Sequence, residues 1–264
     1  MILDVIINNR KKQIREQKRH LPLSVITEQA FEQTMQHKTA DLFGALKGCG
    51  VSVIGEIKKE SPYQRIIRED FEHLSIARTL EAGGAAAIAV ITEQTYYKGS
   101  GESLNAIHKA VGLPVLCKDY IIDEWQICEA RILGADAVLL TASILDLFEM
   151  KKFIAVSEML GMQCLVETRT EEEIKTALRA GARIIGVNNR NPATFDIDQH
   201  RSQELRGFVP QEVAFVAEGG IQTSADMRHM EEIGADAVLV GEALMRAPSI
   251  TDKMHELMGY KNNK

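Results

Sequence analysis

The chain is poor in the features that mark several classes of protein. Among its 264 residues are only four cysteines, six prolines and one tryptophan, and aromatic residues make up 5%. No two cysteines stand in a Cys-x-x-Cys spacing, and no two of the seven histidines stand at a metal-ligand spacing. We therefore expect reduced thiols buried in the core and no bound metal.

Long apolar runs and nucleotide-binding motifs are also lacking. No run approaches the roughly 20 apolar residues of a membrane span, and residues 1–10 lack a signal-peptide core. There is no Gly-x-x-x-x-Gly-Lys loop and no dinucleotide fingerprint. We expect a soluble, cytoplasmic protein that does not bind a membrane.

Length and charge narrow the class further. The apolar content of 45% is ample for a sizeable core, and no linker rich in Ser, Gly or Pro divides the chain into two domains. The net charge of −6 argues against non-specific nucleic-acid binding, although it leaves room for a local basic site that takes an anionic small molecule. We expect one domain over residues 1–264.

Eight short runs rich in Val, Ile, Leu and Ala follow one another along the chain. They cover residues 51–57, 84–91, 114–117, 134–140, 164–166, 181–187, 213–217 and 234–240. Each gap is long enough for a helical crossover, which parallel strands require. Four runs begin with a glycine suited to ending a helix, and two are nearly the same heptad, GADAVLL at 134 and GADAVLV at 234. The pattern predicts an α/β fold, a (β/α)8 TIM barrel, rather than a doubly wound sheet.

Residues 1–48 precede the first strand and predict a helical extension that caps the barrel. Apolar spacing favours one helix up to the interruption at Pro22, and a second over residues 24–35 with Ser24 as its N-cap. The basic run 10–20 on the first helix has two interpretations. It is a solvated helix face, or it lies near an anionic ligand.

The other four runs end in ionisable side chains. Since inward residues at the ends of alternate strands meet in one layer of a barrel, these side chains are expected at its mouth: Glu56, Lys58, Lys118, Glu167 and Glu218. Partial burial of mixed charges shifts pKa values as general acids and bases need. An ordinary salt-bridge layer is the alternative, but an inert barrel has little reason to desolvate five charges.

Two neighbours of Lys118 are assigned structural roles. Alternation along the strand turns Cys117 toward the helices, which predicts packing and not a nucleophile. Asp119 alternates in the same way, and we expect the helix that follows it to hold it.

A phosphate site is expected between the loops after the last two strands, where barrels often bind phosphate through backbone N–H groups. Gly219 and Gly220 follow one strand, and Gly241 and Glu242 follow the other. Arg190, after the sixth strand, adds a guanidinium on the same side. The expected partner is a phosphorylated, anionic small molecule.

Taken together, these residues resemble the indole-3-glycerol phosphate synthase family of tryptophan biosynthesis. The likeness covers nearly the whole chain, including the two helices before the first strand. It rests on GEIKKESP at 55–62, PVLCKDYIID at 114–123, LVE at 165–167 and IGVNNR at 185–190. The resemblance implies a carboxy-lyase that closes the ring of 1-(2-carboxyphenylamino)-1-deoxyribulose 5-phosphate with loss of carbon dioxide and water, and without a cofactor.

The resemblance also implies roles for individual residues. Lys118 would be the general acid in ring closure, and Glu167 would handle a proton in condensation or dehydration. Glu56 and Lys58 would orient the carboxylate and hydroxyls of the substrate, and Asn188 would hold its sugar-derived chain. The full set of expected site residues is Glu56, Lys58, Lys118, Glu167, Asn188 and Glu218 for catalysis, with Ser61, Arg190, Gly219, Gly220, Gly241 and Glu242 for substrate and phosphate.

The chain departs from the family pattern in three places. Tyr63, Gln64 and Arg65 stand where the family usually has Ser-Lys-Gly. Gly219 stands where the family usually has Ser, so one phosphate-facing hydroxyl is missing. The aromatic residue before the glycine of the loop after the second strand is often Phe in the family, whereas this chain has Tyr96-Tyr97-Lys98-Gly99-Ser100.

Two alternatives remain open at the level of the sequence. One is a divergent barrel lyase or isomerase on a related amino-ketose phosphate, with phosphoribosylanthranilate isomerase activity as the nearest case. The other is a non-catalytic barrel subunit that binds a pathway partner. A monomer is expected, because no exposed apolar helix is evident.

Overall fold

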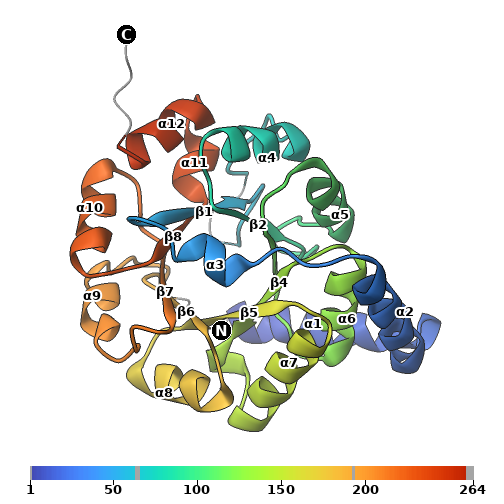
Figure 1. Cartoon of the computed structure of the whole chain (residues 1–264). Helices are drawn as coiled ribbons and strands as arrows, with labels where there is room; N and C mark the ends of the chain where they lie inside the picture. Colours follow the sequence, from blue (N-terminus) through green and yellow to red (C-terminus); the bar gives the residue numbers. More distant parts are fainter. Residues whose placement is uncertain (1, 63–65, 192–193, 260–264) are drawn as a thin grey trace.

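The chain forms a closed barrel of eight parallel strands surrounded by helices, as the sequence predicted (Figure 1). The structure, a computed structural model, describes residues 2–62, 66–191 and 194–259. The strands pair in chain order and β8 closes on β1: β1 Ser52–Ile57, β2 Ala87–Ile91, β3 Val115–Lys118, β4 Ala137–Thr141, β5 Gln163–Thr168, β6 Ile184–Asn188, β7 Ala214–Glu218 and β8 Ala237–Val240.

Helices link successive strands and cover the outside of the barrel. They are α4 His73–Ala82, α5 Gly101–Ala110, α6 Glu124–Ile132, α7 Leu147–Met159 preceded by the short η1 Ala142–Ile144, α8 Glu171–Ala180, α9 His200–Arg206 and α10 Ser224–Glu232, with α11 Glu242–Arg246 and α12 Ile250–Leu257 after β8. Within the described ranges no helix is both long and apolar enough to cross a membrane.

The repeated Gly-Ala-Asp segments have a specific structural role. Gly134 and Gly234 adopt φ values of +96° and +77°, which confirms that these positions favour glycine. Two residues later, Asp136 accepts the backbone N–H of Val115 at 2.8 Å, and Asp236 accepts that of Phe215 at 2.8 Å. Each aspartate therefore ties the start of one strand to the neighbouring strand, and the heptads repeat because the barrel repeats this junction.

The extension before β1 holds three helices, where the sequence predicted two. Helix α1 covers Ile2–His20 and α2 covers Leu23–Gln36. The expected Ser24 cap is wrong, because α2 begins at Leu23 and its N-cap is Pro22, whose fixed φ of −59° suits a residue that opens a helix without a side-chain bond.

The third helix, α3 Leu42–Leu46, is only five residues long and was not predicted. It lies over the centre of the barrel in Figure 1. Leu42 and Leu46 are fully buried and pack against inward side chains such as Ile54 and Leu116, so α3 closes the end of the barrel where the strands begin.

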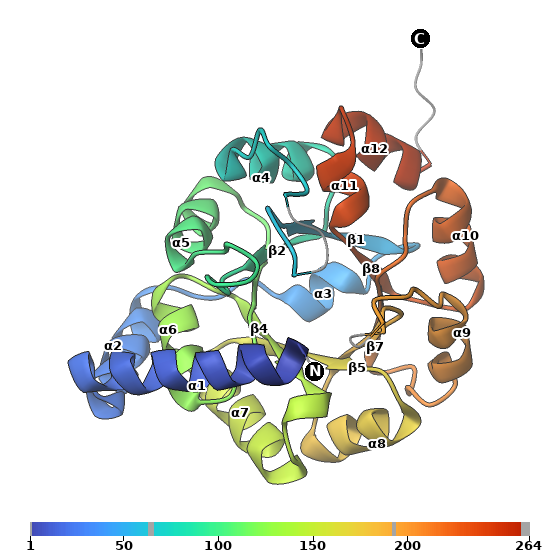
Figure 2. The ribbon, with the colours of Figure 1, turned by 180° about the vertical axis from the view of Figure 1, so that it is seen from behind.

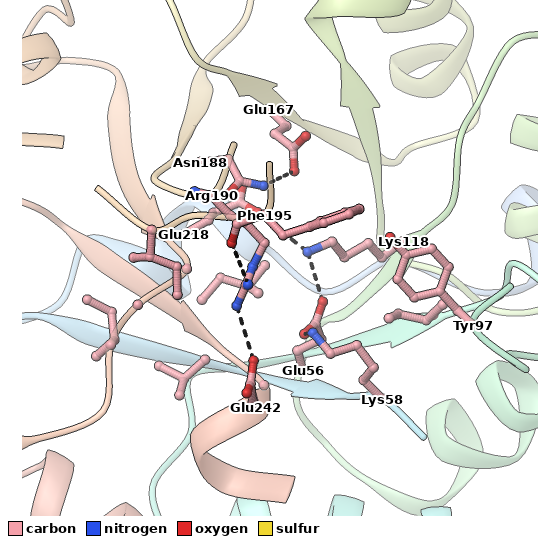
Figure 3. Close-up of a pocket in the computed structure, with 18 of the residues that line it drawn as sticks. Glu56, Lys58, Tyr97, Lys118, Glu167, Asn188, Arg190, Phe195, Glu218 and Glu242 are labelled. Carbon is pink, nitrogen blue, oxygen red and sulfur yellow. Dashed lines mark hydrogen bonds and ion pairs between the residues drawn. The ribbon is translucent and has the colours of Figure 1, made fainter. Parts of the chain in front are cut away.

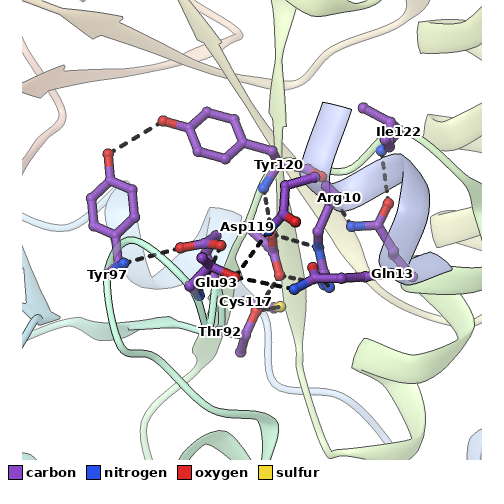
Figure 4. Close-up of polar contacts among 12 residues, drawn as sticks. Arg10, Gln13, Thr92, Glu93, Tyr97, Cys117, Asp119, Tyr120 and Ile122 are labelled. Atoms are coloured by element: carbon purple, nitrogen blue, oxygen red, sulfur yellow. Dashed lines mark hydrogen bonds and ion pairs between the residues drawn. The ribbon is translucent and has the colours of Figure 1, made fainter. Parts of the chain in front are cut away.

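Helix α1 lies at the opposite end, and in the view from behind it runs from the rim of the barrel outward over α6 (Figure 2). It is fastened by a buried ion pair between Arg10 Nη2 and Asp119 Oδ2 at 2.7 Å, with side-chain exposures of 6% and 3%. Asp119 also accepts Thr92 Oγ1 at 2.9 Å, and Gln13 donates to Thr95 at 3.1 Å (Figure 4). The expectation that the following helix holds Asp119 is therefore wrong, because its partner comes from α1, 109 positions earlier in the chain.

The Arg10–Asp119 pair gives a test of how α1 is held. Arg10→Met leaves a buried carboxylate without its counter-ion, and we expect the free energy of unfolding to fall by about 3–5 kcal/mol in urea titration. The neighbouring Lys11 is exposed, so Lys11→Met is the matched control and should stay within about 0.5 kcal/mol of the parent. Equal stability of the two variants would show that α1 docks without this pair.

Candidate active site

A cavity of about 570 Å³ opens at the end of the barrel where the strands finish. Every strand contributes lining residues, which lie in two layers because residues two apart on a strand point to the same side. On the odd-numbered strands the lower layer consists of Glu56, Lys118, Glu167 and Glu218. The upper layer consists of the residues two positions later in the chain, just beyond the strand ends: Lys58, Tyr120, Arg169 and Gly220.

Lys118 is at the centre of the lower layer (Figure 3). Its Nζ lies 2.8 Å from Glu56 Oε1 and 3.5 Å from Glu218 Oε2. Burial alone would lower the pKa of Lys118, but the carboxylates of Glu56, Glu218 and Glu167 outweigh burial and raise the pKa above its ordinary value. Lys118 therefore carries its proton at neutral pH, as a general acid must before reaction.

Glu56 is the buried counter-ion of two lysines. Its Oε2 lies 2.6 Å from Lys58 Nζ, which confirms that residues 56 and 58 face the same side. Burial opposes the charge, yet Lys118 and Lys58 lower the pKa of Glu56 to about 2. Gly241 makes room for this carboxylate, since a Cβ there would lie 2.0 Å from Glu56 Oε2.

Glu218 differs from Glu56 although both contact Lys118. Burial raises the pKa of Glu218 to about 8, and the nearby Glu167 and Glu56 carboxylates add to the effect of burial while Lys118 opposes it. Within the described residues its Oε1 atom is buried without a hydrogen-bond partner. Glu218 is thus the carboxyl group of the lower layer that holds a proton near neutral pH.

Asn188, the last residue of β6, and Asn189, which follows it, fix the opposite side of the site. Asn188 Nδ2 donates to Glu167 Oε2 at 3.0 Å, and Asn188 Oδ1 accepts the Arg190 N–H at 2.9 Å. Asn189 is fully buried and bonds Gly219 O and Ser202, so it ties together the loops after β6 and β7. Asn188 therefore orients Glu167, and Asn189 supports the backbone.

The glycines assigned to phosphate line the cavity, but the backbone explains them without a ligand. Gly219 and Gly220 have φ values of +80° and +87°, and a Cβ on Gly220 would lie 2.5 Å from Ile197 Cγ2. Since Gly241 makes room for Glu56, all three glycines are needed by the fold itself. Their place in the cavity fits a phosphate site, and that site remains a prediction.

The two arginines and the glutamate on the side of the expected phosphate site form ion pairs with one another. Arg190 Nη2 lies 3.1 Å from Glu242 Oε2, and Arg246 Nε lies 3.1 Å from Glu242 Oε1. Glu242 thus fixes two guanidinium groups at the rim of the cavity beside Gly241.

Three further predictions concerned Ser61, the departures at positions 63–65 and the basic run 10–20. Ser61 is buried, and the described lining includes Pro62 but not Ser61. The departures at Tyr63, Gln64 and Arg65 lie outside the described residues.

The functional interpretation of the basic run 10–20 is wrong. Helix α1 lines the cavity only with the apolar residues Ile2, Leu3 and Ile6, because its basic residues are solvent-exposed or paired elsewhere.

Cys117 behaves as expected. It is buried among the residues between strands and helices, and burial raises the pKa of its thiol to about 12, so a thiolate is not available. Among the residues that the structure describes, no group of His, Cys, Asp and Glu could hold a metal ion.

The aromatic wall and Arg169 were missed. Tyr97 Oη lies 3.3 Å from Tyr120 Oη, and both rings line the cavity (Figure 4). Glu93 holds Tyr97 in place by accepting the N–H groups of residues 95, 96 and 97. The i, i+2 rule that placed Lys58 beside Glu56 would also have found Tyr120 and Arg169 beyond Lys118 and Glu167.

Comparisons with known proteins agree with this geometry. Solved structures that share the fold include thiamine phosphate pyrophosphorylase from Pyrococcus furiosus, at 18% identity and a TM-score of 0.60 over 83% of this chain and 97% of that one. Another is a 3-hexulose-6-phosphate synthase, at 17% identity and a TM-score of 0.63 over 80% of this chain and 99% of that one. At such low identity these likenesses show the fold alone.

Sequence relatives are much closer. Indole-3-glycerol phosphate synthase from Acetivibrio thermocellus is 44% identical, over 97% of this chain and 98% of that protein. The same enzyme from Ruminiclostridium cellulolyticum is 42% identical, over 98% and 99%. The family model described as indole-3-glycerol phosphate synthase matches residues 3–257. The chain therefore belongs to the indole-3-glycerol phosphate synthase family.

Proposed function

We propose that this protein converts 1-(2-carboxyphenylamino)-1-deoxyribulose 5-phosphate to indole-3-glycerol phosphate, with loss of carbon dioxide and water. The observation that carries the proposal is the position of the Lys118 ammonium, 2.8 Å from Glu56 and 3.5 Å from Glu218 in a barrel-mouth cavity. A proton donor held among carboxylates is what ring closure and dehydration both require.

Ring closure needs an acid at the ketone. As the ring carbon that bears the carboxylate attacks the carbonyl carbon, the carbonyl oxygen takes a proton from Lys118 and becomes a hydroxyl group. The carbon–carboxylate bond then breaks, and its electron pair restores the aromatic ring as carbon dioxide leaves. Lys118 is suited to the first step because Glu56 and Glu218 hold its ammonium in place before the substrate arrives.

Dehydration needs an acid and a base together. Glu167 takes a proton from the methylene carbon beside the nitrogen, and the new hydroxyl leaves as water after protonation by Lys118. Lys118 must regain a proton between the two steps. Glu218, with its pKa near 8 and its oxygen 3.5 Å from Lys118, is placed to return one.

The remaining residues bind and orient. Glu56 and Lys58 align the hydroxyl groups of the substrate, and Asn188 keeps Glu167 turned toward the substrate. The phosphate is placed against Gly219, Gly220 and Gly241, with Arg190 contributing charge. The proposed enzyme is cytoplasmic and monomeric and needs no metal or organic cofactor.

The direct test is turnover by the purified protein, followed by the rise of indole absorbance. We expect the parent to form product and Lys118→Ala to lose about 10² or more in kcat, the usual scale for a lost general acid. The exposed Lys109 supplies the matched control, and Lys109→Ala should turn over normally. A parent without activity would overturn the proposed function, whereas a fully active Lys118→Ala would only remove Lys118 from the acid role.

Glu167→Gln tests the base. The amide keeps the shape of the side chain and can still pair with Asn188, but it cannot accept the proton, so kcat should fall by about 10² or more. Circular dichroism and the unfolding midpoint should match those of the parent. Retention of most activity would make Glu167 a structural residue.

The protonated state of Glu218 gives a pH test. Its folded pKa of about 8 lies above the ordinary value of 4.5, so the folded chain binds more protons between these values. The contribution of Glu218 to the free energy of unfolding is therefore complete below about pH 4.5 and is lost as the pH rises through 8. Glu218→Gln removes this titration.

Urea titrations of the parent and Glu218→Gln at pH 5 and pH 8.5 measure the effect. The variant should gain at least about 1.4 kcal/mol relative to the parent between these pH values, the equivalent of one pKa unit. A difference that does not change with pH would show that Glu218 titrates normally.

A further inference from the structure

Arg169 is distinct among the cations of the cavity. Six lysine and arginine side chains line it: Lys58, Lys118, Arg169, Arg190, Arg246 and Lys253. Five of them form ion pairs, with Glu56, Glu218, Glu242 or Glu256. Across the described ranges, the Arg169 guanidinium has neither an ion pair nor a hydrogen bond.

The backbone holds Arg169 firmly even though its side chain is unpaired. Its N–H donates to Glu173 Oε2 at 2.6 Å, and its carbonyl accepts Arg201 Nη1 at 3.5 Å. Arg169 directly follows β5, two positions after Glu167, and lines the cavity beyond the proposed base. Two backbone hydrogen bonds therefore fix the start of the Arg169 side chain, directly after the last residue of β5.

The surroundings of Arg169 favour an anionic ligand. Burial and the nearby Arg201 guanidinium both act to lower the pKa of Arg169, and the carboxylates of Glu167 and Glu173 act against them. Glu167 already accepts Asn188, and Glu173 already accepts the Arg169 backbone N–H. A half-buried guanidinium with five donors and no acceptor gains most from an anion that can take two parallel N–H bonds.

A substrate anion can reach Arg169 without breaking an existing pair. On the opposite strand, Lys58 would have to share its ammonium with Glu56, which lies 2.6 Å away (Figure 3). Among the odd-numbered strands, β5 stands between β3, which carries the Tyr120 ring, and β7, which carries the glycines of the expected phosphate site. An aryl group that rests near Tyr120 while its phosphate lies at β7 places a ring substituent within the reach of β5.

We propose that Arg169 binds the ring carboxylate of the substrate through a bidentate guanidinium–carboxylate contact, and so selects the carboxylated aryl amine over one without that group. This assignment rests on the proposed function and adds to it a specificity residue that is not among the acid–base set. Arg169 then also fixes the carboxylate while the bond that releases carbon dioxide breaks.

Binding of two non-reactive ligands tests the assignment. In 1-(2-carboxyphenylamino)-1-deoxyribitol 5-phosphate the ketone is reduced to an alcohol, so ring closure is impossible, and 1-phenylamino-1-deoxyribitol 5-phosphate lacks only the carboxylate. Their Kd values are measured by calorimetry on the parent, Arg169→Met and Arg169→Lys. Arg179→Met is the matched control, because Arg179 is exposed on α8, the helix that follows the same strand.

The expected result is selective. Arg169→Met should weaken binding of the carboxylated ligand by about 10- to 100-fold, the usual range for a lost charged hydrogen bond, and leave the other ligand unchanged. Arg169→Lys should retain part of the preference, and Arg179→Met all of it. Unchanged binding of both ligands by Arg169→Met would overturn the assignment, as would equal weakening of both, which would indicate a phosphate contact or a structural role.

Turnover by the parent separates this inference from the proposed function. If the parent forms product and Arg169→Met keeps its preference for the carboxylated ligand, only the role of Arg169 is wrong. If the parent neither binds the carboxylated ligand nor forms product, the proposed function and the role of Arg169 are both wrong.

Discussion

The ion-pair cluster around Lys118 is the interaction on which the rest of the site depends. One ammonium group lies between Glu56 and Glu218 in a buried layer, and its charge opposes the protonation of both carboxyl groups. Glu56 has a second cation, Lys58, and is held ionised, whereas Glu218 shares Lys118 with Glu56 and takes up a proton far more readily. Two chemically identical side chains thus differ because of their partners.

Desolvating such a cluster is costly, and the barrel is shaped to accommodate it. Gly241 leaves space for Glu56 and Gly186 for Glu218, where an added Cβ would lie 2.0 Å and 2.1 Å from a carboxylate oxygen. At the other end of the barrel, α3 seals an apolar interior with leucines. The barrel thus keeps an apolar interior at one end and its charged side chains at the other, where substrate can meet them.

Much of the fold could be predicted from sequence because its signals are local. Parallel strands buried on both faces read as apolar runs, and helix ends need glycine, so the eight runs and their junctions could be recognised. Alternation along a strand also placed Glu56 beside Lys58 and turned Cys117 away. By contrast, α3 is too short for periodicity to reveal, and the Arg10–Asp119 pair joins segments 109 positions apart.

The untested and the wrong expectations at the site have the same origin. A glycine in a sequence does not say whether a ligand, a positive φ or a neighbouring carboxylate requires it, and Gly241 proved to make room for Glu56. The basic residues of α1 suggested an anion site, yet only the docked helix shows that Ile2, Leu3 and Ile6 are the residues that line the cavity. Identifying Arg169 as unpaired required the partners of every other cation.

The most direct measurement of the central claim is a crystal structure with the ketone-reduced substrate analogue bound. The account predicts that the Lys118 ammonium lies within about 3 Å of the oxygen derived from the ketone, with Glu167 on the side of the adjacent methylene carbon and the phosphate against Gly219, Gly220 and Gly241. An analogue bound with that oxygen away from Lys118, or with its phosphate elsewhere, would contradict it.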